Sequence, residues 1–249
     1  MYKKVMTQVL FGKPFDKYWM DSYFENCNSL GKYGWEWKFF MPEGKSLKHV
    51  EVIKMTLDDF NELVDDKLGI KPKNYIDERE MPHKLMSDYY PAHGLLFDKW
   101  IGGADFWGHC NWDMVFGRLD KWFDDKFLSD CDIFGNDPDA INGIFSLYRN
   151  TPFINHLFKE HPLWKEAFAY VGSDNPYVFD ETCMTDLCKK VSKEGRIRFK
   201  TDWLLSNDHQ DGHEVIPKLK MKKDGSLIDL VKKKEVPMFH FSGTKKWPL

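Results

Sequence analysis

The stretch that decides the fold is Ala104–Gly117, which reads ADFWGHCNWDMVFG. Its first residues are apolar and aromatic, as is typical of a buried strand. Two polar residues, Asn111 and Asp113, interrupt this run before Met114–Phe116 restores it. Because side chains two apart in an extended chain point the same way, these two residues present their oxygen atoms together. Such oxygen ligands suit hard cations, so the stretch predicts a site for Mn²⁺ or Mg²⁺ at the end of the strand. A strand-end turn held by Asx hydrogen bonds is the alternative.

Composition indicates a folded globular protein. The chain has 249 residues, of which 42% are hydrophobic and 16% aromatic, which is enough for a sizeable core. The formal net charge of −3 gives no indication of nucleic-acid binding. We interpret basic runs such as Lys232–Lys234 as solvated surface. Since no linker or repeat is visible, we expect one domain over residues 1–249, in which residues 195–249 form an extension that completes the active site.

The cysteines and the apolar runs bear on the compartment. The chain contains an odd number of cysteines without a CxxC pair, so we expect reduced thiols. The apolar run at the N-terminus is too short for a signal peptide, and no run approaches the roughly 20 residues of a membrane helix. The expectation is a cytoplasmic protein without a transmembrane segment, and peripheral docking on a membrane stays open.

Strands and helices alternate in the first third of the chain. The connections between the strands are too long for hairpins, which favours an α/β fold with a mainly parallel sheet flanked by helices. Thr56 is a good N-cap, with two acidic residues in the turn that follows. The expected strands are Val5–Phe11, Trp35–Phe40 and Val50–Lys54, and the expected helices are Asp16–Asn28 and Leu57–Leu68.

The same reasoning continues to the C-terminus. A helical pattern is expected to break near Pro91, and the pair Asp224-Gly225 predicts a β-hairpin in the C-terminal extension. The expected helices are His83–Trp100, Arg118–Leu128 and Thr182–Ser192, and the expected strands include Ile141–Leu147 and Pro237–Phe241.

The segment from Ser87 to Phe123 resembles a family of glycosyltransferases with a GT-A-type, Rossmann-like fold. That family shows a K-x-x-D-x-x-P-A-x-G helix followed by D-F-W-G-x-x-D-x-D. Three more blocks of the sequence are similar to motifs of that family and occur in the same order, namely Leu10–Pro14, Ile141–Asn150 and Phe179–Glu181. The resemblance extends over roughly the first 180 residues and resumes in the tail.

The tail His240–Trp247 is similar to the H-x-x-G-x-x-K-P-W ending of glycogenin-like and galactosyltransferase-like GT-A enzymes. The resemblance implies that His240 completes the metal site and that Gly243 and a lysine hold the nucleotide diphosphate. These residue types suit the roles, because imidazole binds Mn²⁺, glycine admits a close backbone approach and lysine attracts phosphate. The order Lys-Trp-Pro leaves the choice between Lys245 and Lys246 open.

The sequence departs from the family pattern at several positions. Asn111 stands where the family has its first aspartate, so the site loses one negative charge, whereas Asp113 is retained. In the upstream helix Lys84 is one position out of register, and Tyr90 stands where a second basic residue is common. Asp88 is therefore the better candidate for a contact with the donor.

The resemblance implies a metal-dependent glycosyltransferase that moves a sugar from a nucleotide-sugar, with a UDP-sugar favoured, to an acceptor hydroxyl of a glycan or glycoconjugate. The implied metal ligands are Asn111, Asp113 and His240. Phe11 and Gly12 are expected near the nucleoside, because ligands bind at the carboxyl ends of the strands in such sheets.

The donor sugar is expected near Asn142, Gly143 and the pair Asp180-Glu181. For an inverting reaction, Asp180 or Glu181 is the candidate general base, whereas in a retaining enzyme the pair would only orient the sugar. The pair also suits a merely structural role at a helix N-terminus.

Two other functions stay open. A metal-dependent nucleotidyltransferase or phosphodiesterase would use the same carboxylate but would need more clustered acidic residues for two metals. A non-catalytic sugar- or nucleotide-binding module is also compatible with the replacement at Asn111.

Overall fold

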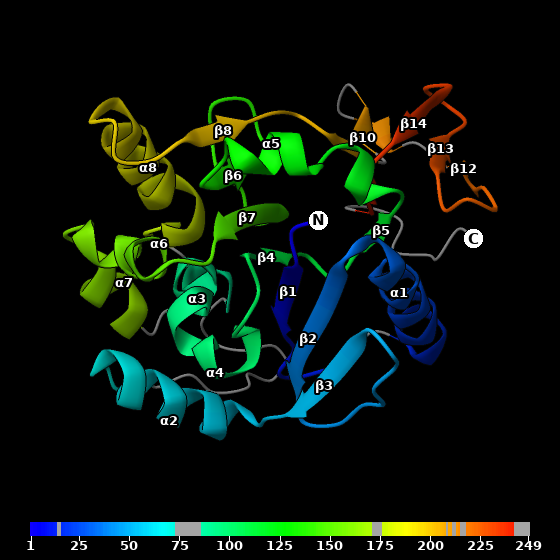
Figure 1. Cartoon of the computed structure of the whole chain (residues 1–249). Helices are drawn as coiled ribbons and strands as arrows, with labels where there is room; N and C mark the ends of the chain where they lie inside the picture. The colour runs from blue at the N-terminus through cyan, green and yellow to red at the C-terminus, as the bar shows by residue number, and fades with distance from the viewer. Residues whose placement is uncertain are drawn as a thin grey trace.

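The computed structural model describes residues 1–13, 16–72, 86–170, 176–207, 209–210, 213–214 and 218–241. For residues 209–210 and 213–214 it describes the backbone alone. Helices lie against a central β-sheet, and smaller sheets adjoin it towards the C-terminus (Figure 1).

The central sheet has seven strands in the order β3-β2-β1-β4-β7-β6-β8. Strands β3, β2, β1 and β4 are parallel, β7 runs antiparallel to both β4 and β6, and β8 is parallel to β6. The strands are β1 Lys4–Val9, β2 Trp35–Met41, β3 Val50–Lys54, β4 Phe106–Cys110, β6 Ile133–Gly135, β7 Phe145–Arg149 and β8 Phe199–Thr201. The expected mixed, mainly parallel α/β fold is confirmed.

The strand order reverses between β1 and β4. The chain adds β2 and then β3 on one side of β1, and β4 pairs with the other side, where Thr7 is in register with His109. The residues that follow β1 and β4 therefore leave the same edge of the sheet side by side. In open α/β sheets this switch in strand order opens a crevice outside the carboxyl ends of the strands, where ligands bind.

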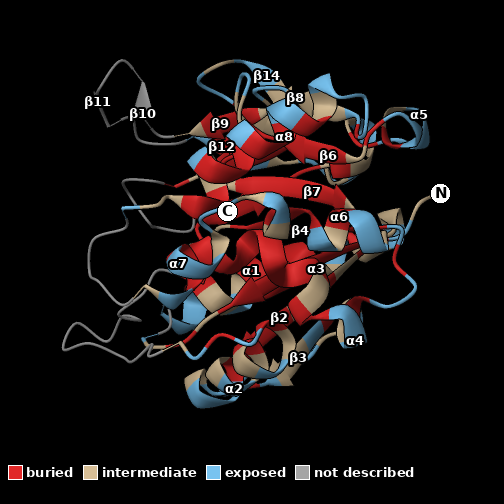
Figure 2. Cartoon of the chain, turned by 90° about the vertical axis from the view of Figure 1, so that its left-hand side faces the viewer, coloured by how far each residue is buried: buried red, intermediate tan, exposed pale blue. Residues whose placement is uncertain are grey.

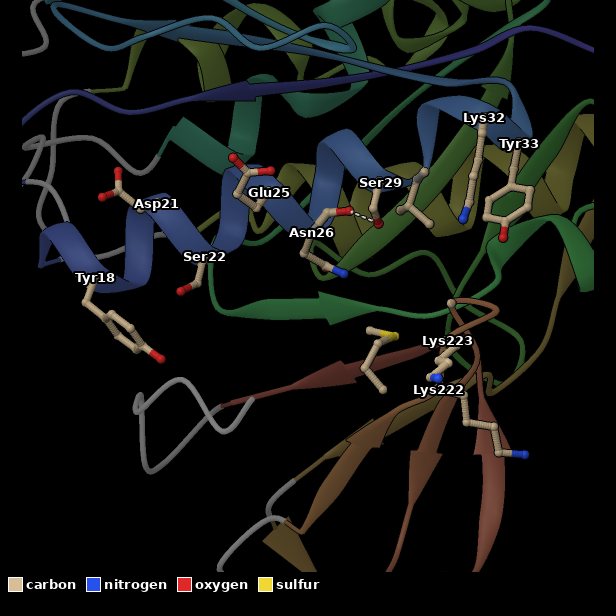
Figure 3. Close-up of a pocket in the computed structure, with 13 residues that line it drawn as sticks. Tyr18, Asp21, Ser22, Glu25, Asn26, Ser29, Lys32, Tyr33, Lys222 and Lys223 are labelled. Carbon is tan, nitrogen blue, oxygen red and sulfur yellow. Dashed lines mark hydrogen bonds between the residues drawn. The ribbon is translucent and has the colours of Figure 1, made fainter.

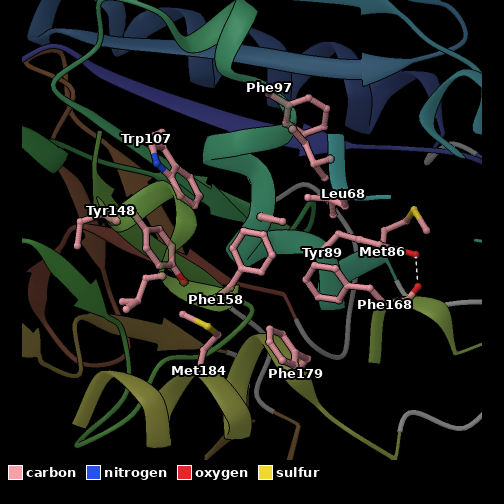
Figure 4. Packing of buried hydrophobic residues seen from close by; sticks show 14 of the residues in the cluster. Leu68, Met86, Tyr89, Phe97, Trp107, Tyr148, Phe158, Phe168, Phe179 and Met184 are labelled. Carbon is pink, nitrogen blue, oxygen red and sulfur yellow. Dashed lines mark hydrogen bonds between the residues drawn. The ribbon is translucent and has the colours of Figure 1, made fainter. Parts of the chain in front are cut away.

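One face of the sheet is covered by the helices of the middle of the chain. Val5 of β1 and Trp107 of β4 belong to the same buried cluster as Phe60, Phe168 and many others. Figure 4 shows part of this packing, in which the Tyr89 hydroxyl donates a hydrogen bond of 2.8 Å to the Phe168 carbonyl. The helices that cover this face are α2 Leu57–Leu68, α3 His93–Leu96, α4 Asp98–Ile101, α6 Pro152–His156, α7 Trp164–Ala169 and α8 Met184–Lys193.

The other face packs against helix α1, Lys17–Ser29, and the smaller sheets. Trp35 and Trp37 of β2 point to this side, as does Tyr23 of α1, whereas Phe40 belongs to the opposite cluster. This alternation along β2 follows from the two-residue period of a strand. Figure 2 shows the buried strands β4 and β7 between more exposed helices.

Local signals fix the ends of helix α2. Thr56 accepts from the Asp59 amide, and the Asp59 carboxylate accepts from the Thr56 amide at 2.8 Å, which makes a capping box. At the other end Gly69 adopts φ 65°, a left-handed conformation that glycine tolerates. The predicted bounds of this helix are confirmed.

The predicted helix Arg118–Leu128 is wrong as a single helix. A 3₁₀ turn at Leu119–Lys121 is followed by a separate helix α5, Asp125–Ser129. The break occurs because the Asp124 carboxylate accepts from the Phe127 amide at 2.7 Å and starts a new helix. A capping side chain has overridden the hydrophobic periodicity.

Two other predicted elements are shifted. The strand expected over Ile141–Leu147 begins only at Phe145, because Asn142 Oδ1 accepts from the Phe145 amide at 3.3 Å and closes a turn. In the region predicted as two helical pieces, Pro91 lies inside a 3₁₀ segment, Met86–Ala92, that precedes α3.

The C-terminal part forms small sheets. Strand β15, Met238–His240, lies between β5, Met114–Phe116, and β9, Leu205–Asn207. The predicted hairpin at Asp224-Gly225 is confirmed, and a third strand joins it. The three strands of that sheet are β12 Leu219–Met221, β13 Leu227–Asp229 and β14 Lys234–Val236, and a further pair is β10 His209–Gln210 with β11 His213–Glu214.

Two further points of the sequence analysis concern the cysteines and the presence of a membrane-spanning helix. All five cysteines lie in the described part and are buried free thiols, as predicted. Among the described residues, no helix combines the length and the apolar character needed to cross a membrane.

Candidate functional site

Asp113 and His240 meet beyond the carboxyl end of β4. The Nε2 atom of His240 lies 3.0 Å from Oδ1 of Asp113, and their side chains are only 12% and 11% exposed. The contact follows from strand pairing, because His240 is in register with Met114 and the Phe241 amide donates to the Asp113 carbonyl at 2.8 Å. Two of the three predicted metal ligands are therefore in direct contact.

The third predicted ligand, Asn111, is held through its backbone. Its amide donates to the Ile144 carbonyl at 3.0 Å, and its carbonyl accepts from the Tyr23 hydroxyl at 3.3 Å. The intervening Trp112 turns inward, and its indole donates to the Val9 carbonyl at 3.1 Å. That bond ties the end of β4 to the end of β1, so the strand ends at the switch in strand order are joined.

In the segment that follows β1, main-chain groups rather than side chains are available to a ligand. The Phe11 side chain is 3% exposed and packs against Phe60 in the core, with ring centroids 5.5 Å apart. Gly12 adopts φ 102°, a conformation that L side chains rarely adopt. A nucleoside at these residues would therefore meet main-chain groups.

A second group forms around Gly143. Its amide donates to Glu181 Oε1 at 2.9 Å, and a Cβ atom at this glycine would lie 2.8 Å from Asp180 Oδ2. Both carboxylates come from the π-helical turn Phe179–Cys183, which precedes α8. The structure thus brings the two predicted catalytic residues together with a predicted sugar-contacting residue.

Asp88 and Asn142 support this group. The Asp88 side chain is buried and accepts from the Phe179 amide at 2.9 Å, next to Asp180 in the chain. Asn142 donates to the Asn136 carbonyl at 2.7 Å and accepts from the Phe145 amide, so its amide group shapes the turn that presents Gly143.

Tyr90 contacts both β4 and the group around Gly143, and the sequence analysis assigned no role to it. Its ring stacks on His109 with centroids 4.2 Å apart, and it lies 3.8 Å from the Cβ position of Gly143. Burial, and then the charges of Asp180, Cys110 and Asp113, raise the pKa of Tyr90, so the phenol keeps its proton. The available signal was its place in the D-Y-Y-P-A-x-G stretch, where the family often has a basic residue.

The layer beneath Tyr90 is uncharged. Burial lowers the pKa of His109 to about 3 and holds that of His93 well below its ordinary value. The Thr7 hydroxyl donates to the Gly108 carbonyl at 2.9 Å, so it accepts from His93 Nδ1 at the same distance. The imidazoles of His93 and His109, which lie next to Tyr90, are therefore neutral.

Several predicted residues lie outside the described part of the chain. They are Gly243, Lys245 and Lys246 of the tail and Lys84 of the upstream segment, and their roles stay predictions. Over the described ranges, no three His, Cys, Asp or Glu side chains gather as a metal-binding group. The donor set at Asp113 and His240, with an amide at Asn111, is nevertheless of the kind that Mn²⁺ accepts.

A comparison with models of protein families shows to which family the chain belongs. Residues 11–241 match a family described as a family of unknown function, DUF6625. The chain belongs to this family. No protein of curated function matches it.

Some solved structures are similar to this DUF6625 member. The galactosyltransferase LgtC in complex with donor and acceptor sugar analogues is 11% identical, with a TM-score of 0.46, over 97% of this chain and 87% of that one. Mouse xyloside xylosyltransferase 1, in its apo form, is 8% identical, with a TM-score of 0.45, over 99% of both chains. A glycosyltransferase involved in glycosylation of the major capsid of PBCV-1 is 11% identical, with a TM-score of 0.40, over 97% and 94%. At such identities and scores, these similarities assign neither a substrate nor a residue role.

A separate cleft of about 570 Å³ lies between α1 and the turn of the β12–β13 hairpin (Figure 3). Tyr18 and Glu25 line it from α1, and Lys222 lines it from the hairpin. Its floor includes Asn26, whose side chain exchanges two hydrogen bonds with the Phe116 backbone, at 2.9 and 2.8 Å. Of the predicted site residues that the structure describes, none lines that cleft.

Proposed function

We propose that this DUF6625 member is a metal-dependent glycosyltransferase. It would move a sugar from a nucleotide-sugar, with a UDP-sugar favoured, to an acceptor hydroxyl of a glycan or glycoconjugate. The observation that carries the proposal is the 3.0 Å contact between Asp113 and His240, beyond the strand that flanks the switch in strand order. A carboxylate and an imidazole converging there are suited to a cation that binds a diphosphate.

In this proposal Asp113 and His240 hold Mn²⁺ or Mg²⁺, and Asn111 assists through its amide oxygen. When bound, the cation offsets the negative charge that develops on the departing nucleoside diphosphate. The backbone at Phe11 and Gly12 binds the nucleoside. Gly243 and either Lys245 or Lys246 support the phosphates.

The extension over residues 195–249 has a defined part in the proposal. It contains β15, and pairing of β15 with β5 is what brings His240 to Asp113. The extension also supplies β8 to the central sheet. We therefore treat residues 1–249 as one functional domain whose site needs its C-terminal part.

The group around Gly143 would receive the sugars. Asp180 or Glu181 takes the proton of the acceptor hydroxyl as that oxygen attacks the anomeric carbon, and the bond to the diphosphate breaks. The amide of Gly143 orients Glu181, and Asp88 fixes the turn before Asp180 by accepting from Phe179. In a retaining reaction the same carboxylates would orient the donor sugar.

A thermal-shift screen tests the binding half of the proposal. UDP, GDP, CMP and dTDP and their sugars are added with and without Mn²⁺ to the wild type, to Asp113→Ala and to Asp66→Ala, an exposed carboxylate on α2 that serves as control. A ligand at about 100 times its dissociation constant adds about 2.7 kcal/mol of stability. We expect one nucleotide to shift the melting temperature only with the metal, in the wild type and in Asp66→Ala. Absence of any nucleotide-dependent shift contradicts the proposal, and binding without turnover favours a non-catalytic module.

A further inference from the structure

The sheet β12–β14, which we name the lysine-rich sheet and define as residues 218–236, differs in charge from the rest of the protein. It contains seven lysines against three acidic residues, in a chain whose formal net charge is −3. The lysines are Lys218, Lys220, Lys222, Lys223, Lys232, Lys233 and Lys234. Such a concentration of positive charge on a single small sheet attracts anionic surfaces.

Lys218 and Lys220, at the start of β12, lie on the outer face of this sheet. Leu219, Leu227 and Val236 are buried against the core. Lys220 alternates with Leu219 along β12 and is exposed, as is Lys218, whose carbonyl accepts from the Leu230 amide at 2.8 Å. The alternation of the strand therefore separates an apolar inner face from a basic outer face.

The turn between β13 and β14 adds an exposed apolar pair. Leu230 is 46% exposed and Val231 is 40% exposed, and Lys232–Lys234 follow directly. Aliphatic side chains held in water next to a basic run are typical of segments that enter the interface of a membrane.

This apolar turn is held rigidly. The amides of Val231 and Lys232 both donate to Asp229 Oδ1 at 2.9 Å. The other oxygen of Asp229 accepts from the Ser206 hydroxyl at 2.5 Å, which ties the turn to β9. Because the exposed pair is already ordered, a binding event there loses little conformational entropy.

We propose that the lysine-rich sheet docks on a membrane surface that contains anionic lipid. Leu230 and Val231 enter the headgroup region, and the lysines next to them, Lys218 and Lys232–Lys234, lie against lipid phosphates. Stable attachment combines the attraction of such lysines to anionic lipid with an inserted apolar group. The observations favour lipid over nucleic acid, because the exposed pair is aliphatic and gives no face for stacking on bases.

The location of the sheet is compatible with this role. In Figures 1 and 2 the lysine-rich sheet and helix α2 lie at opposite ends of the molecule, so docking leaves the face covered by α2 free. Only Pro237 separates β14 from β15, which contains His240. Docking would therefore hold the Asp113–His240 pair at a fixed orientation to the lipid surface. The inference does not depend on the proposed transferase activity.

Vesicle sedimentation tests the proposal on the full chain. The wild type should bind vesicles of phosphatidylcholine mixed with phosphatidylglycerol, should not bind phosphatidylcholine alone, and should be released by salt. Lys232→Glu/Lys233→Glu/Lys234→Glu should lower the partition coefficient at least tenfold. The matched control is Lys189→Glu/Lys190→Glu/Lys193→Glu, three exposed lysines of α8 with the same change in charge. It should bind like the wild type.

A second variant separates the apolar contribution from charge. Leu230→Ser/Val231→Ser keeps the net charge and changes only exposed side chains, and it should lower vesicle binding several-fold while the circular dichroism spectrum is unchanged. Failure of the wild type to bind anionic vesicles overturns the proposal, as does equal loss in both lysine variants. Tight binding of duplex DNA or RNA by the wild type and by the serine variant alike would indicate nucleic acid instead.

Discussion

His240 Nε2 lies 3.0 Å from Asp113 Oδ1, although the two residues are 127 positions apart in the chain. Strand β15 makes this contact possible, because it pairs antiparallel with β5 on one side and parallel with β9 on the other. The carboxylate of Asp113, which follows β4, and the imidazole of His240, from the C-terminal extension, thus lie in one site.

The first prediction concerns this pair. Asp113→Asn and His240→Ala should each weaken Mn²⁺-dependent nucleotide binding by at least about tenfold, because each removes a ligand of the proposed cation. Isothermal titration calorimetry with and without Mn²⁺ measures the effect, and His156→Ala, an exposed histidine of α6, is the control. Unchanged affinity in both variants would remove the pair from the metal site.

The second prediction concerns the space at Gly143. A methyl group there would lie 2.8 Å from Asp180 Oδ2, so Gly143→Ala should cost about 1–3 kcal/mol of unfolding free energy and should displace the carboxylate. Urea denaturation measures the stability. Gly102→Ala is the matched control, since the nearest atom to its Cβ position is 3.5 Å away, and it should be close to neutral. A Gly143→Ala protein as stable as the control would mean that the carboxylates move aside freely.

The third prediction separates the two candidate bases. In an inverting reaction, one of Asp180→Asn and Glu181→Gln should lower kcat by about 10²–10⁴, the usual contribution of a general base. The other should change kcat by less than about tenfold, because its amide keeps an oxygen that can accept a hydrogen bond, as Glu181 does from Gly143. Nucleotide affinity should be preserved in both variants. If neither variant lowers kcat, neither carboxylate is the base.

The fourth prediction concerns the dependence of stability on pH. Burial alone would raise the pKa of Asp132, but hydrogen bonds from Arg198 and Arg149 lower it to about 2. A lowered pKa in the folded state stabilises the protein above the ordinary value near 3.9 and loses that effect as the pH falls towards 2. Asp132→Asn should therefore cost about 1–2 kcal/mol at pH 7, after allowance for solvent screening.

Denaturation curves between pH 7 and pH 2 test this prediction. The difference between wild type and Asp132→Asn should shrink below about pH 4. A difference that stays constant with pH would show that the carboxylate contributes through packing rather than through its charge.

The fifth prediction concerns the layer beneath the site. Thr7→Val replaces a hydroxyl with a methyl group of similar size and removes the hydrogen bonds that this hydroxyl makes with His93 Nδ1 and the Gly108 carbonyl. Since both groups are buried, we expect a loss of about 1–3 kcal/mol in unfolding free energy. Thr7→Ser retains the hydroxyl and should lose less. Equal stability of the valine and serine variants would contradict the assigned bonds.

The sequence predicted those elements whose determinants are local. Helix α2 has the predicted bounds because Thr56, Asp59 and Gly69 each act within one turn of the helix ends. The hairpin at Asp224-Gly225 was predicted for the same reason, since the turn pair lies between the strands it joins.

In each misplaced element, a local hydrogen bond opposes the structure that the hydrophobic pattern favours. The sequence does not show which of the two effects is stronger. In Arg118–Leu128 the apolar spacing predicted one helix, but the Asp124 side chain caps a new helix inside it. At Asn142 the side chain closes a turn where the apolar run predicted strand. In both cases one hydrogen bond from a short polar side chain outweighs the periodicity.

The candidate site was predicted only in part. Asp113 was predicted from the polar break that follows its strand, whereas His240 was predicted only through the resemblance, because no local pattern reports a contact between residues so far apart in the chain. Tyr90 was missed because its position depends on three separate segments, which supply His109, Gly143 and Asp180. Such a site arises from tertiary packing, and a single sequence contains no direct signal of it.

The most direct test of the transferase proposal is release of nucleoside diphosphate from a panel of nucleotide-sugars, with and without Mn²⁺, by the wild type and by Asp113→Ala. We expect release from one nucleotide-sugar that requires the cation and is lost in Asp113→Ala, while Asp66→Ala keeps it. Release that is independent of the cation and of Asp113, or no release from any donor that binds, would contradict the proposal.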